Sequence, residues 1–539
     1  MSAYEDDVDQ QYLASLRGQI TAFLKACNPS QQGTTPPLAI FFFPGGLGSR
    51  LLRAIQPAPF GPPYFYYTVW LDCSIVLGVA QDLELVGVQD WQDEYIIPGG
   101  PIAFSYDGFV QWCAENNLPL FFCGWDWRRK SGHAADFFLN KLLPAIDAAA
   151  VADGYAYNPL NNFWLIGHSF GGMVVKRILN ETNNGYVQKM KGAITVATPF
   201  YGSGGQVHRF FVGEKDLNPI LGPNGASKCT RIVSTLPANY EILFLDQPTF
   251  NANQTAFLQD PAGYNLPNYP STDAISGQPA DPYNPVPGPP PTPPATGMVR
   301  YVQNYNFSWS LLCDGETASQ LTSQYLDPSI GSKFWNVRYV QTGDDGSDLN
   351  ATVVSQTWAE VNANFNPDTD PDPITDTGGA GDGVVPAWSA RLIGLDNSHV
   401  VTVHAPGLEH ANLMNEGVVQ KELAALLNLP PQLMLVAQAS AVTTPLNAAS
   451  RDELNALTER LREVTSQPLS PGERKKAILE ILLKLSRDQR NALLVRAYLD
   501  AFKSPSQLSG SSDQGRSKGS KGKAPSKPEP KPKAERKRK

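Results

Sequence analysis

The stretch of sequence that decides the fold is FWLIGHSFGGMVVKRIL, residues 163–179. It begins with a continuous apolar run up to Gly167, as in a strand buried on both faces. Apolar residues at helical spacing follow from Met173 onward. Between the two runs, a G-x-S-x-G sequence centres on Ser169. A strand, a glycine-flanked serine and a helix in this order predict a strained turn that exposes the Ser169 hydroxyl. N–H groups at the start of the helix can then stabilise an oxyanion.

Further apolar runs on both sides of this stretch predict more buried strands. They span residues 38–43, 119–123, 193–197, 336–340 and 399–403. Helical stretches lie between some of them, such as residues 134–150. Strands that are apolar throughout and alternate with helices are typical of an α/β fold with a doubly wound, mostly parallel sheet.

The alternation stops between about residues 200 and 335. Proline occupies nine of the sixteen positions from Pro279 to Pro294, a composition compatible only with polyproline II or disorder. We interpret residues 200–335 as a cap inserted into the sheet domain; a plain linker between two domains is the alternative. Candidate catalytic residues on both sides of the segment favour the insertion.

The sequence therefore predicts six segments. They are an N-terminal helical segment (1–35), a first part of the core (36–199) with a lid insertion near 50–110, a cap (200–335) with a Pro-rich loop (265–297), a second part of the core (336–430), a helical appendage (445–503) and a basic disordered tail (504–539). The appendage is predicted from three Ser-x-x-Glu/Gln capping boxes that begin at Ser450, Ser470 and Ser486. The Ser-, Gly-, Lys- and Pro-rich composition of the tail predicts disorder.

The net charge of −8 is an average over two unlike parts. Residues 504–539 hold 11 Lys/Arg and 3 Asp/Glu, a charge of +8, so residues 1–503 carry −16. An acidic body disfavours nucleic-acid binding outside the tail. The tail's own partner stays open between anionic lipid, nucleic acid, an import factor and no partner at all.

Several other classes are disfavoured by sequence. No apolar run reaches the ~20 residues of a membrane span, and the N-terminus lacks the pattern of a signal peptide. We therefore expect a soluble, cytoplasmic protein that can bind membranes peripherally. The six cysteines form no C-x-x-C pair, and nucleotide-binding glycine motifs are missing. We expect no metal and no cofactor.

A serine hydroxyl needs a base to remove its proton. In the α/β-hydrolase arrangement the order along the chain is serine, acid, histidine. His399 and His404 flank a predicted strand and can be strand-end residues, whereas His410 lies in the loop beyond it. That loop is where the base belongs, so His410 is our candidate.

The acid should be a carboxylate on an earlier loop that follows a strand. Asp382 has glycine on both sides and an apolar segment after it, which suits a sharp turn. Its role would be to hold the tautomer of the histidine. Asp344 and Asp345, directly after the 336–340 run, are rivals. Asp372 and Asp376 lie in an Asp/Pro-rich stretch that we interpret as a solvated loop.

The oxyanion hole needs two donors. One should be the N–H of Phe170, which follows the serine, and the other should come from the loop after the first core strand. That loop is PGGLGS, residues 44–49, and Gly46 is our candidate. The loop lacks the Lys and Ser/Thr of a phosphate-binding loop.

Seven motifs, in order along the chain, resemble those of the lecithin:cholesterol acyltransferase family, which includes lysosomal phospholipase A2 and phospholipid:diacylglycerol acyltransferases. They are PGGLGS (44–49), TVWLD (68–72), WDWR (125–128), GHSFGG (167–172), ATPFYG (197–202), GDGVVP (381–386) and HANLM (410–414). The resemblance covers roughly residues 36–425. It implies an α/β-hydrolase fold with a cap and a lid. It also implies that Trp70, in the lid motif, contacts lipid; for the nearby Tyr66, lipid contact and ordinary cap core stay open.

The resemblance further implies a serine-dependent lipid acyltransferase or phospholipase. An acyl chain would pass from a phospholipid or related ester to Ser169, and then to an alcohol or to water. A general carboxylesterase, lipase or polyester hydrolase with the same Ser169, Asp382 and His410 is the alternative. A catalytically dead interaction module is a third hypothesis.

Overall fold

The computed structural model describes residues 3–28, 37–55, 65–70, 96–213, 224–274, 277, 279–281, 331–359, 366–407 and 409–429. The predicted helical appendage and basic tail lie outside these residues, as does most of the Pro-rich loop. Among the described helices, none combines the length and the apolar character needed to cross a membrane.

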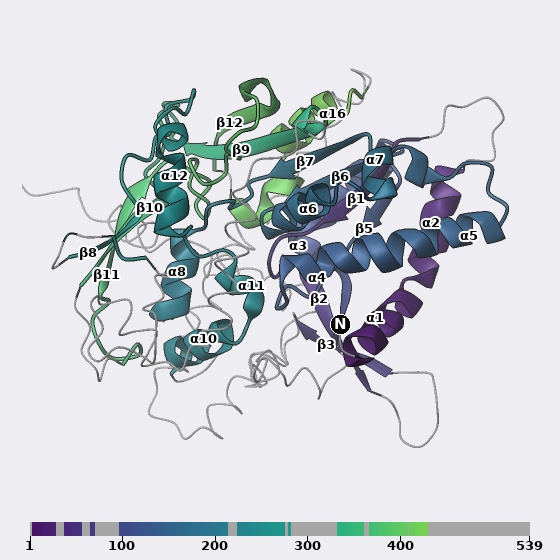
Figure 1. Cartoon of the computed structure of the whole chain (residues 1–539), viewed down its shortest axis with the longest axis horizontal. Helices are drawn as coiled ribbons and strands as arrows, with labels where there is room; N and C mark the ends of the chain where they lie inside the picture. Colours follow the sequence, from purple (N-terminus) through teal and green to yellow (C-terminus); the bar gives the residue numbers. More distant parts are fainter. Residues whose placement is uncertain are drawn as a thin grey trace, which may run out of the picture.

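A twisted parallel sheet forms the centre of the described chain (Figure 1). Its order is β12-β9-β7-β6-β1-β5, and every neighbouring pair is parallel. The strands are β1 (Ala39–Phe43), β5 (Leu120–Phe122), β6 (Phe163–His168), β7 (Gly192–Val196), β9 (Phe334–Thr342) and β12 (Val400–Pro406). The chain adds strands first on one side of β1 and then on the other, so the fold is the doubly wound α/β-hydrolase fold that the sequence predicts.

Helices cover both faces of this sheet. Along β1, Phe41 and Phe43 belong to one hydrophobic cluster, and Ile40 and Phe42 belong to the other. This explains why the strands are apolar throughout instead of alternating. The first face carries α2 (Arg17–Cys27), α4 (Ser131–Phe137), the π-helical turn η3 (Phe138–Leu142), α5 (Leu143–Ala152) and α6 (Phe170–Asn180); the second carries α3 (Ala103–Glu115) and α16 (Gly417–Leu426).

Helix α1 (Ala3–Ser15) and α2 cover the open edge of the sheet beside β5. The hydroxyl of Tyr12 donates to the carbonyl of Gly124 at 2.6 Å, and the amide of Gln19 donates to that of Phe122 at 3.0 Å. An exposed strand edge invites pairing with other chains. The two helices therefore protect the edge and fix the segment that follows β5.

The predicted lid region contains a small antiparallel sheet with the order β3-β2-β4. Its strands are β2 (Ser49–Ile55), β3 (Phe65–Trp70) and β4 (Ile96–Pro101). Because β2 begins at Ser49, this sheet starts where the 44–49 loop ends.

The predicted cap folds around a second sheet, β11-β10-β8, on the left in Figure 1. Residues of the predicted cap form α8 (Gly204–Phe211), α10 (Gly225–Ser234), α11 (Pro237–Tyr240), α12 (Gln247–Phe257) and β8 (Ser271–Asp273), whereas β10 (Thr352–Trp358) and β11 (Ile374–Gly379) come from the predicted second part of the core. Strand β8 pairs with β10, so chain from the predicted second part of the core shares a sheet with the predicted cap.

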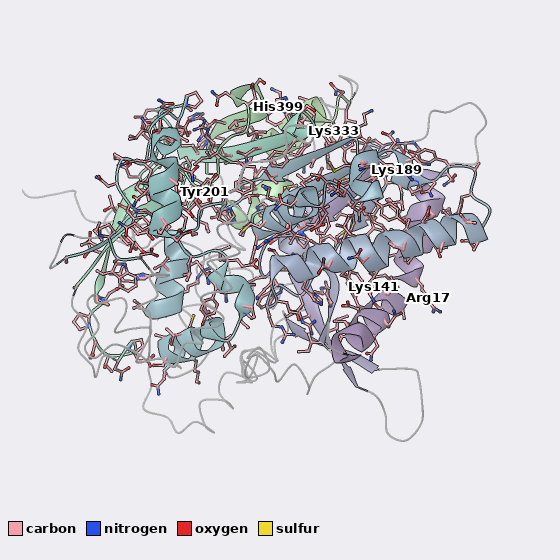
Figure 2. All side chains as sticks on the ribbon, in the orientation of Figure 1. Arg17, Lys141, Lys189, Tyr201, Lys333 and His399 are labelled. Atoms are coloured by element: carbon pink, nitrogen blue, oxygen red, sulfur yellow. The ribbon has the colours of Figure 1, made fainter. Side chains whose placement is uncertain are left out.

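Buried contacts join the cap to the central sheet. Arg338 on β9 forms a close ion pair with Asp260, which follows α12, and also donates to the carbonyl of Ala387 at 3.1 Å. Within the predicted cap, the ring of Tyr201, which is labelled in Figure 2, packs edge-on against Phe257 of α12 at 5.1 Å. The remaining short helices are η4 (Pro159–Asn161), α7 (Gly185–Lys189), η6 (Asn397–His399) and η7 (His410–Asn415).

Candidate active site

Ser169 lies at the junction of β6 and α6, and its backbone is strained. Its φ of 52° and ψ of −127° lie outside the regions that L-residues prefer. The geometry requires glycine nearby, because a Cβ on Gly171 would lie 2.2 Å from the carbonyl oxygen of Phe43. The glycine lets α6 start directly against the end of β1. The strained turn leaves Ser169 half-buried at the carboxyl edge of the sheet, the edge where α/β folds bind ligands.

His410 is the first residue of η7, which follows β12. Its Nε2 lies 2.8 Å from the Oγ of Ser169. The turn is held in place by Asn415, whose side chain accepts the N–H of Phe109 of α3 at 3.0 Å, and by the fully buried Leu413 and Met414. The histidine is therefore positioned by packing against α3 on the second face of the sheet.

Asp382 lies beside the carboxyl end of β9, on the far side of His410 from the serine. Its Oδ2 lies 2.7 Å from Nδ1 of His410. Its Oδ1 accepts the N–H groups of Val384 at 3.0 Å and Val385 at 2.7 Å. Gln341 of β9 donates to its carbonyl at 3.2 Å. The carboxylate is 1% exposed, and these donors fix which oxygen faces the histidine.

The structure thus brings the three predicted residues into one chain of hydrogen bonds from Ser169 through His410 to Asp382. In this arrangement the histidine can accept the serine proton at Nε2 while its Nδ1–H donates to the carboxylate. The hydroxyl then becomes a competent nucleophile.

The 44–49 loop lies against the serine. Strands β1 and β6 pair directly, so Phe43 lies opposite Gly167 and the segments that follow them lie side by side. A Cβ on Gly45 would lie 3.0 Å from the Cβ of Ser169, and one on Gly46 would lie 3.5 Å from the ring of Phe170. In the described chain, no hydrogen bond is made by the N–H of Gly46 or of Phe170. Both donors are thus available to an oxyanion at this edge.

The rival residues lie elsewhere. His399, labelled in Figure 2, stacks on Trp335 at 5.0 Å, and its Nδ1 lies 2.8 Å from the carbonyl oxygen of Phe334. His404 is exposed and pairs with Asp348 at 3.2 Å. Asp344 is exposed, and Asp345 accepts the hydroxyl of Ser347 in a surface turn.

The interpretation as a solvated loop holds for Asp372, which is exposed and precedes β11, but it is wrong for Asp376. Asp376 lies on β11, where Gln356 donates to it at 2.8 Å; burial raises its pKa, against the effect of the nearby His208. Asp372 pairs with Nε2 of His208 at 2.6 Å. His208 also follows Ser169 in the chain, and sequence reasoning missed this pair, which joins α8 to the 366–374 segment. The sequence of β11 is largely polar and does not predict a strand, but β11 pairs with β10 in the fold.

Trp70 and Tyr66, the predicted lipid-contact residues, lie on β3. In the register of the small sheet, Trp70 pairs with Leu51 and Tyr66 with Ala54. The pairing partner of Trp70 thus lies two positions beyond Ser49, the end of the 44–49 loop, and lipid contact by the two residues stays a prediction. The Leu71–Asp72 part of the lid motif lies outside the described residues.

Two further features bear on the chemistry. A cavity of about 460 Å³ lies beside the acid loop, between Tyr264, Gln356 and Ala380, but Ser169 does not line it. Within the described ranges, no group of three or more His, Cys, Asp or Glu side chains is arranged to hold a metal ion.

A search of solved structures finds two matches at low identity. The crystal structure of the Tle4-Tli4 complex is 14% identical and covers 76% of this chain and 99% of its own, with a TM-score of 0.43. The crystal structure of Bacillus licheniformis lipase BlEst2 in its mature form is 12% identical and covers 76% of this chain and 96% of its own, with a TM-score of 0.29. The assignment of the fold rests on the strand order instead of on these similarities.

Comparison of the sequence with known proteins gives one family. No curated protein matches the chain. The sequence model of the family described as lecithin:cholesterol acyltransferase matches residues 101–263. This span contains the WDWR, GHSFGG and ATPFYG motifs and therefore confirms the resemblance that they carry. Over residues 101–263, the chain is similar to the lecithin:cholesterol acyltransferase family.

Proposed function

We propose that this protein is a serine-dependent lipid acyltransferase or phospholipase that works through an acyl-Ser169 intermediate. The observation that carries the proposal is the chain of hydrogen bonds at 2.8 Å from Ser169 to His410 and 2.7 Å from His410 to Asp382. The family match over residues 101–263 supports a lipid acyl ester as the substrate.

In the first half-reaction, His410 Nε2 takes the proton of the Ser169 hydroxyl as its oxygen attacks the ester carbonyl. The N–H groups of Gly46 and Phe170 stabilise the oxyanion that develops. His410 is then an imidazolium, held by Asp382. It returns the proton to the leaving alcohol, for a phospholipid the lysophospholipid, and the acyl chain stays on Ser169.

In the second half-reaction, an alcohol or water takes the place of the leaving group. His410 removes its proton, and the resulting oxygen nucleophile attacks the acyl-serine carbonyl. Collapse of the intermediate releases a new ester or a fatty acid, and His410 returns the proton to Ser169. Transferase and hydrolase activity thus share one machinery and differ only in the acceptor.

Labelling with a fluorophosphonate probe, combined with mass spectrometry of lipid products, tests the proposal. Wild-type protein should be labelled at Ser169 and should consume phospholipid in mixed vesicles supplied with acceptor alcohols. Ser169→Ala should abolish both signals. Folded wild type that is neither labelled nor active would contradict the proposal. A new ester identifies a transferase, and free fatty acid alone identifies a phospholipase.

A further inference from the structure

The 44–49 loop is tied at both ends to one segment of the chain, the WDWR motif that follows β5. The indole N–H of Trp125 donates to the carbonyl of Pro44 at 2.9 Å, and that of Trp127 donates to the carbonyl of Ser49 at 3.1 Å. The backbone N–H of Trp125 donates to the hydroxyl of Ser49 at 3.1 Å. Both tryptophans are almost fully buried.

Trp125 also touches the other half of the proposed oxyanion hole. Its ring packs edge-on against the ring of Phe170, with centroids 5.1 Å apart and planes at 88°. The two proposed donors belong to Gly46, within the loop, and to Phe170. One buried side chain therefore contacts both the loop that carries the first donor and the residue that carries the second.

The segment that presents Trp125 is itself rigid. Arg128 binds Asp126 through two hydrogen bonds of 2.8 and 2.7 Å. Burial raises the pKa of Asp126, but the charge and hydrogen bonds of Arg128 together with the charge of Arg129 outweigh burial and lower it. On the other side, Tyr12 of α1 holds the carbonyl of Gly124. A support fixed at both ends can hold the loop in one position.

We propose that Trp125 is a positioning residue that sets the separation of the two oxyanion donors through its indole N–H bond to Pro44 and its backbone N–H bond to Ser49. The inference rests on the proposed function of Gly46 and Phe170. Correct placement of the two donors matters most when negative charge develops on the substrate oxygen in the transition state. Loss of the support from Trp125 should therefore lower kcat more than it changes KM.

The test compares Trp125→Phe with Trp164→Phe in the full chain. Both substitutions keep a buried aromatic ring, but Trp164 lies at the far end of β6 and its indole N–H has no partner in the described structure. With a soluble p-nitrophenyl ester, Trp125→Phe should lower kcat about tenfold or more at nearly constant KM. Inhibition by a trifluoromethyl ketone, whose serine adduct carries the oxyanion, should weaken by a similar factor. Trp164→Phe should leave all three values near those of wild type.

A folded Trp125→Phe variant with wild-type kcat overturns the inference, and so does an equal loss of kcat in both variants. If Trp125→Phe does not fold, Ser49→Ala carries the test, since it removes the acceptor of the Trp125 backbone N–H from the loop side. Ser49→Ala should give the same selective loss of kcat, and wild-type kinetics would overturn the inference. A wild type that neither turns over ester nor reacts with fluorophosphonate overturns the proposed function itself, and is thus distinguishable.

Discussion

The imidazole rings of His168 and His410 lie side by side, with centroids 5.1 Å apart and planes at 35°. His168 precedes Ser169 and is 2% exposed. The hydroxyl of Tyr106 lies 3.0 Å from its Nδ1 and accepts the N–H of Gly45 at 2.8 Å. Burial lowers the pKa of His168 well below its ordinary value, and His410 lowers it further. A second imidazole, neutral at physiological pH, therefore lies beside the proposed base.

The first prediction concerns acid stability. Below about pH 6.5 the unfolded chain binds a proton at His168 while the folded chain does not. The free energy of unfolding should therefore decrease as the pH is lowered. The slope due to this one group is at most about 1.4 kcal/mol per pH unit. His168→Gln should lose less stability than wild type between about pH 7 and about pH 5, as measured by urea unfolding.

The control for this prediction is His404→Gln. His404 is exposed, and its pair with Asp348 at 3.2 Å is of the surface kind that contributes little to stability. This variant should show the same dependence on pH as wild type. If His168→Gln also kept the full wild-type dependence, the buried histidine would not be its source.

The second prediction concerns Asp382. Its Oδ1 is already occupied by two backbone N–H groups, so Asp382→Asn would leave the side chain in place but could direct an amide N–H at His410. That favours the wrong tautomer of His410, and kcat should fall about 10⁴-fold. Steady-state hydrolysis of a p-nitrophenyl ester measures the loss.

Asp345→Asn is the matched control, because Asp345 also follows β9 but lies in an exposed turn. It should retain wild-type kcat. Retained activity in Asp382→Asn, or a comparable loss in Asp345→Asn, would mean that the carboxylate facing His410 is not the one that the chemistry uses.

The sequence predicts well what is local. A continuous apolar run reports burial on both faces, so all the strands of the central sheet are visible as runs of residues, β1 and β6 among them. The turn at Ser169 is equally local, because strand, glycine and helix adjoin it. These signals are enough to place the serine at the correct edge of the sheet.

Contacts between distant segments leave no such signal. Strand β11 reads ITDTGG and resembles a solvated loop; only its pairing with β10 makes it a strand. The bond from Trp125 to the carbonyl of Pro44 joins residues 81 positions apart, and the pair of His208 with Asp372 joins residues 164 positions apart. The sequence shows the residue types in each case, but only the fold shows which atoms meet.

The third prediction concerns Gly172, in the first turn of α6. A Cβ at this position would lie 1.8 Å from the hydroxyl oxygen of Thr198 and 2.8 Å from its Cβ. Gly172→Ala must therefore displace the segment after β7 or the start of α6, which directly follows Ser169. Overpacking of this kind costs about 1–3 kcal/mol. Urea unfolding should show this loss, and fluorophosphonate labelling should slow.

Gly132→Ala is the matched control, because Gly132 also lies in the first turn of a helix, α4, and a Cβ there would meet nothing within 4 Å. Alanine is the better helix former by up to about 1 kcal/mol, so this variant should be as stable as wild type or slightly more stable. Equal stability of the two variants would contradict the close packing of Gly172 on Thr198.

The fourth prediction concerns Lys176, one full turn further along α6. Its side chain is fully buried, and its Nζ donates to Asn180 at 2.6 Å. Burial lowers its pKa to about 8, and Arg177 contributes further. At neutral pH the folded chain therefore buries a charged ammonium group, which lowers the free energy of unfolding. This cost is present in full below about pH 8 and disappears as the pH approaches the ordinary lysine pKa of about 10.4.

Lys176→Met should raise the free energy of unfolding by about 1–3 kcal/mol at pH 7, because an apolar side chain of similar length replaces a buried cation. The gain should shrink at about pH 10, where the lysine is largely neutral in the folded chain. Urea unfolding of both proteins at the two pH values measures the difference. A variant less stable than wild type at neutral pH would mean that the bond to Asn180 outweighs the burial of the charge.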